Sequence, residues 1–158
     1  MNIILDPERW PHIGLYEIAC KCRHANCKYK TRDEVLSVID PGILTAFEHI
    51  RELLGGNPIR INSAIRCPWH NQDIGGTKYS PHVPQKLADG SFRSYAIDLS
   101  IIGHFSSPKQ MRDLIRLYYP DMRIGWMKYQ SFVHIDMAYM YPNKNEVMKK
   151  NWVRGGEW

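Results

Sequence analysis

The segment that most constrains the fold is a short apolar run, "SFVHIDM" at residues 131–137, which contains a histidine and an aspartate two positions apart. In a β-strand, side chains two positions apart point to the same face, so His134 and Asp136 share one face and Val133 and Ile135 the other. Ionisable groups are costly to bury unless they are paired, hydrogen-bonded or bound to a metal. The segment therefore predicts a strand that carries either a satisfied His–Asp pair within the core or part of a metal or catalytic site.

The length and composition are those of one ordinary globular domain. Of the 158 residues, 44% are hydrophobic and 23% charged, and the net charge is +5. A basic surface favours polyanions such as an anionic cell wall, anionic lipid or nucleic acid. The basic residues are spread along the chain, and their one modest cluster lies near the C-terminus, at Lys144, Lys149, Lys150 and Arg154. We therefore expect no nucleic-acid partner, and we separately expect a monomer.

The N-terminal sequence "MNIILDPERWPHIG" lacks the features of an export signal. Its apolar run of three residues ends at Asp6, and no basic leader precedes it. No stretch of the chain approaches the roughly 20 apolar residues that a membrane helix needs. These features predict a protein that is made in a cytoplasm, is not inserted in a membrane, and reaches an outside target only when something else releases it.

Capping signals and alternating patterns predict an α+β fold. One helix is predicted over residues 39–56, where Asp40 is the cap, and another over 106–120, where Ser107 and Gln110 form a capping box. Strands are predicted at 58–66, in the two arms of a hairpin over 83–100, at 122–129 and at 131–137. We expect a single domain over residues 1–140, with helices packed on a mostly antiparallel sheet. A basic tail, 141–158, would pack on this domain or extend from it.

The predicted hairpin supplies two candidate partners for His134. Asp89–Gly90 is a two-residue turn signal, so the bases of the two arms should lie close together. His82 precedes one base, and Asp98 ends the other among apolar residues, where a solvated carboxylate is not expected. Because a catalytic zinc ion usually has three protein ligands and a water, these three side chains would form a ligand set with an open position.

The motifs together resemble a known family. The segments "INSAIRCPWHNQDIGG", "SPH", "AIDLS" and "GWMKYQSFVHIDM" are similar to the zinc D-Ala-D-Ala carboxypeptidase family of peptidoglycan metallopeptidases. Members of that family include bacterial wall-maturation enzymes and phage lysis enzymes (endolysins), and their fold is shared with the hedgehog signalling domain. The resemblance extends from about Tyr16 to Met137.

The resemblance implies roles for several residues. It makes His82, Asp98 and His134 the ligands of one catalytic zinc ion. It makes Arg66 the group that binds a substrate carboxylate or stabilises the developing oxyanion, and a structural salt bridge is the alternative for this arginine. Ser80 is expected to support substrate binding through hydrogen bonds rather than to act as a nucleophile.

Two departures from the family pattern concern substrate choice and proton transfer. The connection between the first histidine and the aspartate is longer than in relatives, with Ser94 at the place of a glycine, and an inserted hairpin there could overhang the site. Ser131 stands where several relatives have Glu, Asp or His as the general base, and a serine cannot do that work. Asp136 is then the candidate base, and orienting His134 by a hydrogen bond is its alternative role.

Four cysteines, Cys20, Cys22, Cys27 and Cys67, form a second set of candidate ligands. They could bind a structural zinc ion, with His24 as a possible substitute ligand, or form disulfides after export. The C-x-C-x4-C spacing is not that of a standard zinc ribbon, so reduced, buried thiols are the default for a cytoplasmic product. We favour a structural role over a catalytic one.

The sequence therefore predicts a zinc-dependent peptidase that hydrolyses peptide stems or cross-links of bacterial peptidoglycan. It would act as a D,D-carboxypeptidase or endopeptidase in phage-type cell-wall lysis. The alternative is a catalytically silent binding or virion-associated module that keeps the zinc fold, and Ser131 is its main support. Nucleic-acid binding is a third and weaker interpretation of the basic charge.

Overall fold

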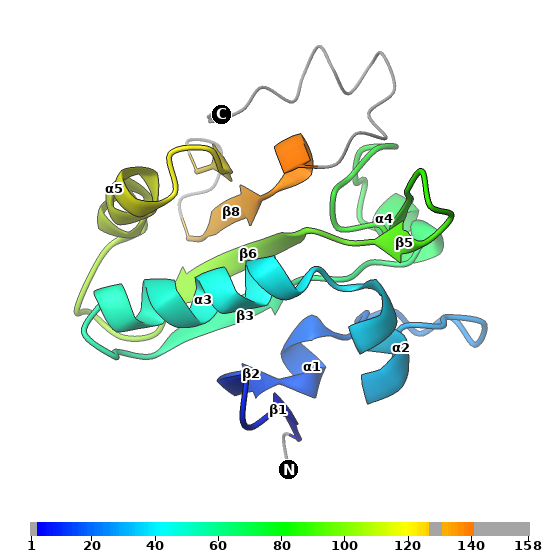
Figure 1. Cartoon of the computed structure of the whole chain (residues 1–158), viewed down its shortest axis with the longest axis horizontal. Helices are drawn as coiled ribbons and strands as arrows, with labels where there is room; N and C mark the ends of the chain where they lie inside the picture. Colours follow the sequence, from blue (N-terminus) through cyan, green and yellow to red (C-terminus); the bar gives the residue numbers. More distant parts are fainter. Residues whose placement is uncertain (1–2, 127–130, 141–158) are drawn as a thin grey trace.

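A four-stranded antiparallel sheet forms the centre of the fold (Figure 1). The computed structural model describes residues 3–126 and 131–140. The strands of this sheet, in spatial order, are β3 (Ile59–Ser63), β6 (Ala96–Ile101), β8 (Val133–Asp136) and β7 (Arg123–Gly125). The predicted α+β architecture with helices on an antiparallel sheet is confirmed.

The two faces of the central strands differ in chemistry. On one face, Ile97 and Leu99 of β6 and Val133 and Ile135 of β8 are fully buried in the main hydrophobic core. The alternate residues of the same strands carry the ionisable side chains, because successive side chains of a strand point to opposite faces. All four residues of β8 are buried, so its polar face is covered by other parts of the chain.

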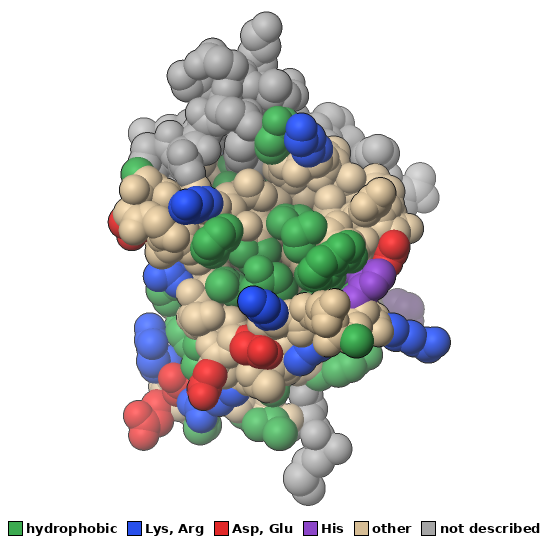
Figure 2. Space-filling view, turned by 90° about the vertical axis from the view of Figure 1, so that its right-hand side faces the viewer, with side chains coloured by type: hydrophobic (Ala, Val, Ile, Leu, Met, Phe, Trp, Pro, Cys, Tyr) green, Lys and Arg blue, Asp and Glu red, His purple; other side chains and the backbone are tan. Residues whose placement is uncertain are grey.

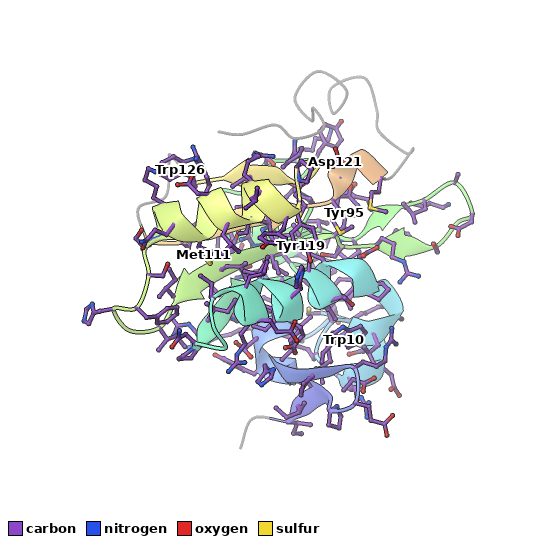
Figure 3. The ribbon with its side chains drawn as sticks, turned by 60° about the vertical axis from the view of Figure 1, so that its left-hand side comes forward. Trp10, Tyr95, Met111, Tyr119, Asp121 and Trp126 are labelled. Carbon is purple, nitrogen blue, oxygen red and sulfur yellow. The ribbon has the colours of Figure 1, made fainter. Side chains whose placement is uncertain are left out.

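Helices α3 (Pro41–Leu53) and α5 (Pro108–Tyr118) cover the apolar face of the sheet (Figure 3). Both were predicted, and both begin where their caps indicate. The Asp40 carboxylate accepts hydrogen bonds from the first turn of α3, and Ser107 and Gln110 form the capping box of α5. The helices complete the core with the side chains of Ile43, Leu44, Phe47, Ile50, Met111 and Ile115.

The N-terminal elements were not predicted. They are β1 (Ile4–Asp6), β2 (Trp10–Gly14), α1 (Leu15–Ile18) and α2 (Arg32–Val38). Each is too short to show clear periodicity, although the capping box of Thr31 and Glu34 was a usable signal for α2. Together with α3 and β3 they bury Leu5, Trp10, Ile13, Ile18 and Val35.

The hairpin before β6 differs from the prediction. Its paired arms are only β4 (Gln85–Lys86) and β5 (Phe92–Arg93), and five residues rather than two connect them, with Gly90 at a positive φ of 83°. The chain then leaves the hairpin, and β6 pairs with β3 and β8 in the central sheet. Asp89–Gly90 was therefore correct as a turn signal but wrong as a two-residue connection.

Two further features complete the chain. Helix α4 (Pro68–Asp73) was not predicted, and a short 3-10 helix, η1 (Ala138–Met140), follows β8. The predicted tail, 141–158, and the last part of the strand predicted at 122–129 lie outside the described residues. In the part of the chain that the structure describes, the helices are too short or too polar to cross a membrane.

Candidate active site

Three predicted ligands meet on the polar face of the sheet. Asp98 on β6 and His134 on β8 lie directly opposite each other in the strand register, and the loop before β4 brings His82 to them. The Asp98 Oδ1 atom is 2.8 Å from His134 Nδ1 and 3.2 Å from His82 Nε2, and the two nitrogens are 3.1 Å apart. All three side chains are buried. These three atoms are therefore placed to bind one metal ion.

The hydrogen bonds of the two histidines determine which ring nitrogens are free for a metal. His82 Nδ1 lies 2.6 Å from the Ala64 carbonyl oxygen, which can only accept, so Nδ1 carries the hydrogen. His134 Nε2 lies 3.0 Å from Asp136 Oδ2 and donates to that carboxylate. Each histidine thus turns its other nitrogen, the one available to a metal, toward Asp98. A hydrogen bond from the ring nitrogen that does not face the metal is usual for metal-binding histidines, because it orients the ring; we call these bonds, to Ala64 and Asp136, the second contacts of the two histidines.

The cluster of three acceptor atoms requires a positive charge among them. Burial alone would raise the pKa of Asp98, but His82 and His134 beside it hold that pKa well below its usual range. Burial also lowers the pKa of His82. For His134, burial is outweighed by the hydrogen bonds to Asp136 and Asp98, which raise its pKa to about 9. Without a metal, a proton on His134 supplies the charge, and a divalent cation fits the same donor set.

Asp136 is fully buried, and both of its carboxylate oxygens accept hydrogen bonds. Arg123 on β7, directly opposite in the register, binds both oxygens through Nε and Nη2 at distances from 2.7 to 3.2 Å. The Ala138 backbone N–H and His134 Nε2 donate the other two hydrogen bonds. These contacts outweigh burial and lower the pKa of Asp136 to about 2. The carboxylate is held as an anion behind His134.

Arg123 was missed by the sequence analysis. It is buried in a strand whose neighbours are apolar, and this was the available signal, because a buried arginine needs an anionic partner. Its partner could not be named without the pairing of β7 with β8. The structure shows that the His134–Asp136 pair of the sequence is one part of a longer chain of contacts, from Asp98 through His134 and Asp136 to Arg123.

Arg66 lies beside the candidate ligands. Its Nη2 donates to Asp98 Oδ2 at 2.7 Å, and its Nε donates to Ser63 Oγ at 2.9 Å. The Arg66 backbone N–H also donates to the carbonyl of His82, so the arginine and the histidine loop hold each other in place. The salt bridge foreseen as the alternative for Arg66 is present, and it is made with a candidate ligand.

The three serines that the motifs singled out differ in position. Ser80 is buried, and its Oγ accepts a hydrogen bond from the His82 backbone N–H at 3.4 Å. Ser94 is fully buried, and its hydroxyl donates to the carbonyl of His82 at 3.1 Å. Ser131 is exposed, and its carbonyl accepts from the Ser100 hydroxyl. Ser80 and Ser94 therefore support the loop that presents His82.

The two glycines of "HNQDIGG" shape the loop between α4 and His82. Gly75 ends α4 with a positive φ of 69°. A Cβ atom on Gly76 would lie 2.1 Å from the side-chain oxygen of Asn71, whose amide nitrogen donates to the Thr77 carbonyl. Only glycine allows this close approach.

Helix α4 and the β4–β5 hairpin also expose hydrophobic side chains, among them Trp69 and Phe92. Figure 2 faces this side of the molecule and shows hydrophobic side chains gathered in the middle of the surface, with Lys and Arg around them. The hairpin itself projects beyond the sheet beside α4 (Figures 1 and 3). The inserted connection thus exposes the large hydrophobic side chain of Phe92.

The four cysteines also come together, in a buried group with their sulfur atoms within 4.8 Å of one another. His24, the possible substitute ligand, lies at the surface, where its Nε2 is 2.7 Å from Asp73 Oδ2. Among the described residues, the cysteines and the His82–Asp98–His134 set are the two groups that could hold a metal ion.

A buried His–Asp–His set, with each histidine oriented by a second acceptor and an arginine beside the carboxylate, is an arrangement that a metal-dependent hydrolase can use. The family model described as Peptidase M15 matches residues 11–136. The chain belongs to this family of zinc-dependent peptidases, and the matched range contains all three candidate ligands. No curated protein and no solved structure is similar enough to the chain to count as a match.

Proposed function

We propose that the protein is a zinc peptidase that hydrolyses the peptide stems or cross-links of bacterial peptidoglycan. The observation that carries the proposal is the meeting of His82 Nε2, Asp98 Oδ1 and His134 Nδ1 within 3.2 Å, with both ring tautomers set by second contacts. A zinc ion held by these atoms would polarise the scissile carbonyl and lower the pKa of the attacking water.

Arg66 is proposed to bind the substrate. Its contacts with Asp98 and Ser63 hold the guanidinium beside the ligand set, and its remaining N–H groups are donors for a substrate carboxylate or for the oxygen that gains charge in the reaction. Ser80 acts through the loop of His82. Its hydroxyl accepts from the backbone of the histidine, which supports a positioning role rather than direct contact with the peptide.

Asp136 is proposed to orient His134 and not to act as the general base. A general base must reach the proton that it takes, whereas Asp136 is buried and both of its oxygens already accept hydrogen bonds. Its pKa of about 2 also makes it a weak base. The aspartate instead keeps the hydrogen on His134 Nε2 and leaves Nδ1 free.

The setting is proposed to be phage-type lysis of the cell wall, as a D,D-carboxypeptidase or endopeptidase. The net charge of +5 would help the protein to remain on an anionic wall. The second candidate is a silent module that binds the wall without cutting it. It is favoured by the lack of a general base among the two candidates. Ser131 cannot act as a general base, and the oxygens of Asp136 already accept hydrogen bonds from Arg123 and His134.

Digestion of purified peptidoglycan, with mass spectrometry of the released fragments, separates the two candidates. Zinc-loaded protein should release fragments cut at one type of peptide bond, and a chelator should stop the release. His134→Ala should be inactive, while Lys109→Ala, an exposed change on α5, should behave as the wild type. A folded, zinc-loaded protein that sediments with several wall types but releases nothing from any of them would support the silent module.

A further inference from the structure

The four cysteines come from two segments that are distant in sequence. Cys20, Cys22 and Cys27 lie in the loop after α1, and Cys67 lies directly before α4. All four are buried, and their sulfur atoms lie within 4.8 Å of one another. The sulfurs of Cys22 and Cys67 are 3.6 Å apart. Zinc–sulfur bonds of about 2.3 Å in a tetrahedron place the sulfurs about 3.8 Å from one another, so the group has the size of a zinc site.

The backbone around the group is arranged to stabilise thiolates. Each sulfur accepts a hydrogen bond from a backbone N–H group, and such donors stabilise the negative charge of a thiolate. The Cys67 N–H donates to Cys20 Sγ at 3.3 Å, and the His70 N–H donates to Cys67 Sγ at 3.4 Å. The N–H groups of His24 and Tyr29 donate in the same way to the sulfurs of Cys22 and Cys27, although burial raises the pKa of the Cys27 thiol to about 12 when no metal is bound.

The charge of the surrounding chain complements a tetrathiolate site. Four thiolates and one divalent cation carry a net charge of −2. Residues 19–32 contain no acidic residue, and their basic residues are Lys21, Arg23, Lys28, Lys30 and Arg32. The ammonium group of Lys30 donates to the backbone carbonyls of both Cys20 and Cys22 and so lies beside the backbone that carries two of the sulfurs.

The local conformation explains how the unusual spacing can work. Residues 20–24 contain no helix or turn, and in an extended segment residues two apart point to the same side, so Cys20 and Cys22 face the same centre. The chain then turns, with the Cys27 N–H bonded to the His24 carbonyl, and returns so that the Cys20 N–H bonds to the Tyr29 carbonyl. A C-x-C pair and a turn thus replace the two knuckles of a standard zinc ribbon.

We propose that Cys20, Cys22, Cys27 and Cys67 bind one structural zinc ion, which is separate from the candidate active site. Four protein ligands close the coordination shell, which is typical of structural rather than catalytic zinc. The ion joins the loop after α1 to the segment that carries Arg66, the neighbour of Cys67. It thereby helps to hold the guanidinium of Arg66 against Asp98. The proposal does not depend on the peptidase activity.

The test is a zinc count on the whole protein, purified under reducing conditions. The wild type should hold about two zinc ions per chain, and His82→Ala/His134→Ala about one, since only the cysteine site remains. Cobalt substitution of the wild type should give the near-ultraviolet charge-transfer bands of sulfur-bound cobalt. A mercurial that reacts with thiols should release one ion from both proteins, with four thiols consumed.

Several results would overturn the proposal. One is a wild type with a single zinc ion that is lost in the double histidine variant. Another is a cobalt spectrum without sulfur bands, and a third is the finding of disulfides by mass spectrometry of the unreduced protein. If the double variant does not fold, the cobalt spectrum and the mercurial release of the wild type still decide.

Discussion

The two candidate metal groups are built in opposite ways. The His82–Asp98–His134 set has two of its members on paired strands, and second contacts to Ala64 and Asp136 orient both histidines. The cysteine group is carried by a loop and by the residue before a short helix. Sheet register can hold two ligands in place, with the third from an anchored loop, while another coordination position stays open for substrate. A loop can instead close around an ion and take its shape from it.

The two groups also differ in the charged residues around them. Near the histidines, single arginines are paired one to one with carboxylates, Arg66 with Asp98 and Arg123 with Asp136. Near the cysteines, residues 19–32 contain basic residues and no acidic one, and Lys30 bonds to the backbone of Cys20 and Cys22. In the first group each carboxylate already has an arginine partner without a metal, whereas we propose that the second group is complete only with its metal. Removing parts of each group should therefore have different consequences.

The largest effect is expected for His134→Ala. Loss of one of three ligands should remove zinc from the active site and reduce the rate of wall-peptide hydrolysis by more than about 10³-fold, since the reaction would lose its cation. The cysteine group should keep its ion. Hydrolysis rates and zinc counts on the same sample measure both. A variant that keeps most of its activity would exclude His134 as a ligand.

The next effect concerns stability. Arg123→Ala leaves the Asp136 carboxylate buried without its main partner, and breaking a buried pair in this way costs about 3–5 kcal/mol in the free energy of unfolding. Denaturant titration of the zinc-free protein gives this number. Lys109→Ala, which breaks an exposed pair on α5, serves as the control and should leave the midpoint unchanged. Equal midpoints for the two variants would contradict the role given to Arg123.

A smaller effect is expected for Asp136→Asn. The loss of an orienting carboxylate behind a metal-binding histidine typically weakens metal affinity or activity by about 10–100-fold. Competition with a zinc chelator measures the affinity of the active site. If Asp136 were the general base, the rate would fall while the zinc affinity stayed the same, so the pair of measurements separates the two roles.

The pH dependence of His134 gives the same variant a second readout. In the zinc-free wild type, the ring should keep both protons until the pH rises through about 9, and zinc must displace one of them. Zinc affinity should therefore rise with pH and level off above about 9. Asp136→Asn should lower the pKa of the His134 ring, because the hydrogen bond to the Asp136 carboxylate is a main cause of the elevated value. NMR of the ring nitrogens measures it, and an unchanged pKa would contradict the proposed contact.

The smallest effect on stability is expected for Phe92→Ala. The side chain is exposed on the hairpin, so its removal should change the free energy of unfolding by no more than about 0.5 kcal/mol. Both zinc ions should stay. If the hairpin takes part in substrate choice, KM for wall fragments should change while kcat does not. An identical KM for fragments of every length would remove the hairpin from substrate binding.

Elements specified by local signals matched their predictions better than elements that depend on contacts between distant segments. Helices α3 and α5 were predicted to within a few residues, because Asp40 and the pair of Ser107 and Gln110 are local signals. The hairpin was predicted with arms that were too long. The predicted second arm included β6, which instead belongs to the central sheet and whose partners β3 and β8 lie far away in sequence. The short N-terminal elements were missed because their stability comes from packing rather than from their own periodicity.

The sequence by itself determined which side chains were available: a His and an Asp two apart in a strand, a His and an Asp at the ends of an insertion, and a cluster of cysteines. The tertiary structure alone decided how they are used. Strand register places Asp98 opposite His134. The hydrogen bond to the Ala64 carbonyl determines the tautomer of His82, and Arg123 forms an ion pair with the carboxylate of Asp136. The physical reason is that pairing between distant strands, and the burial that follows from it, sets the distances on which hydrogen bonds and metal ligation depend.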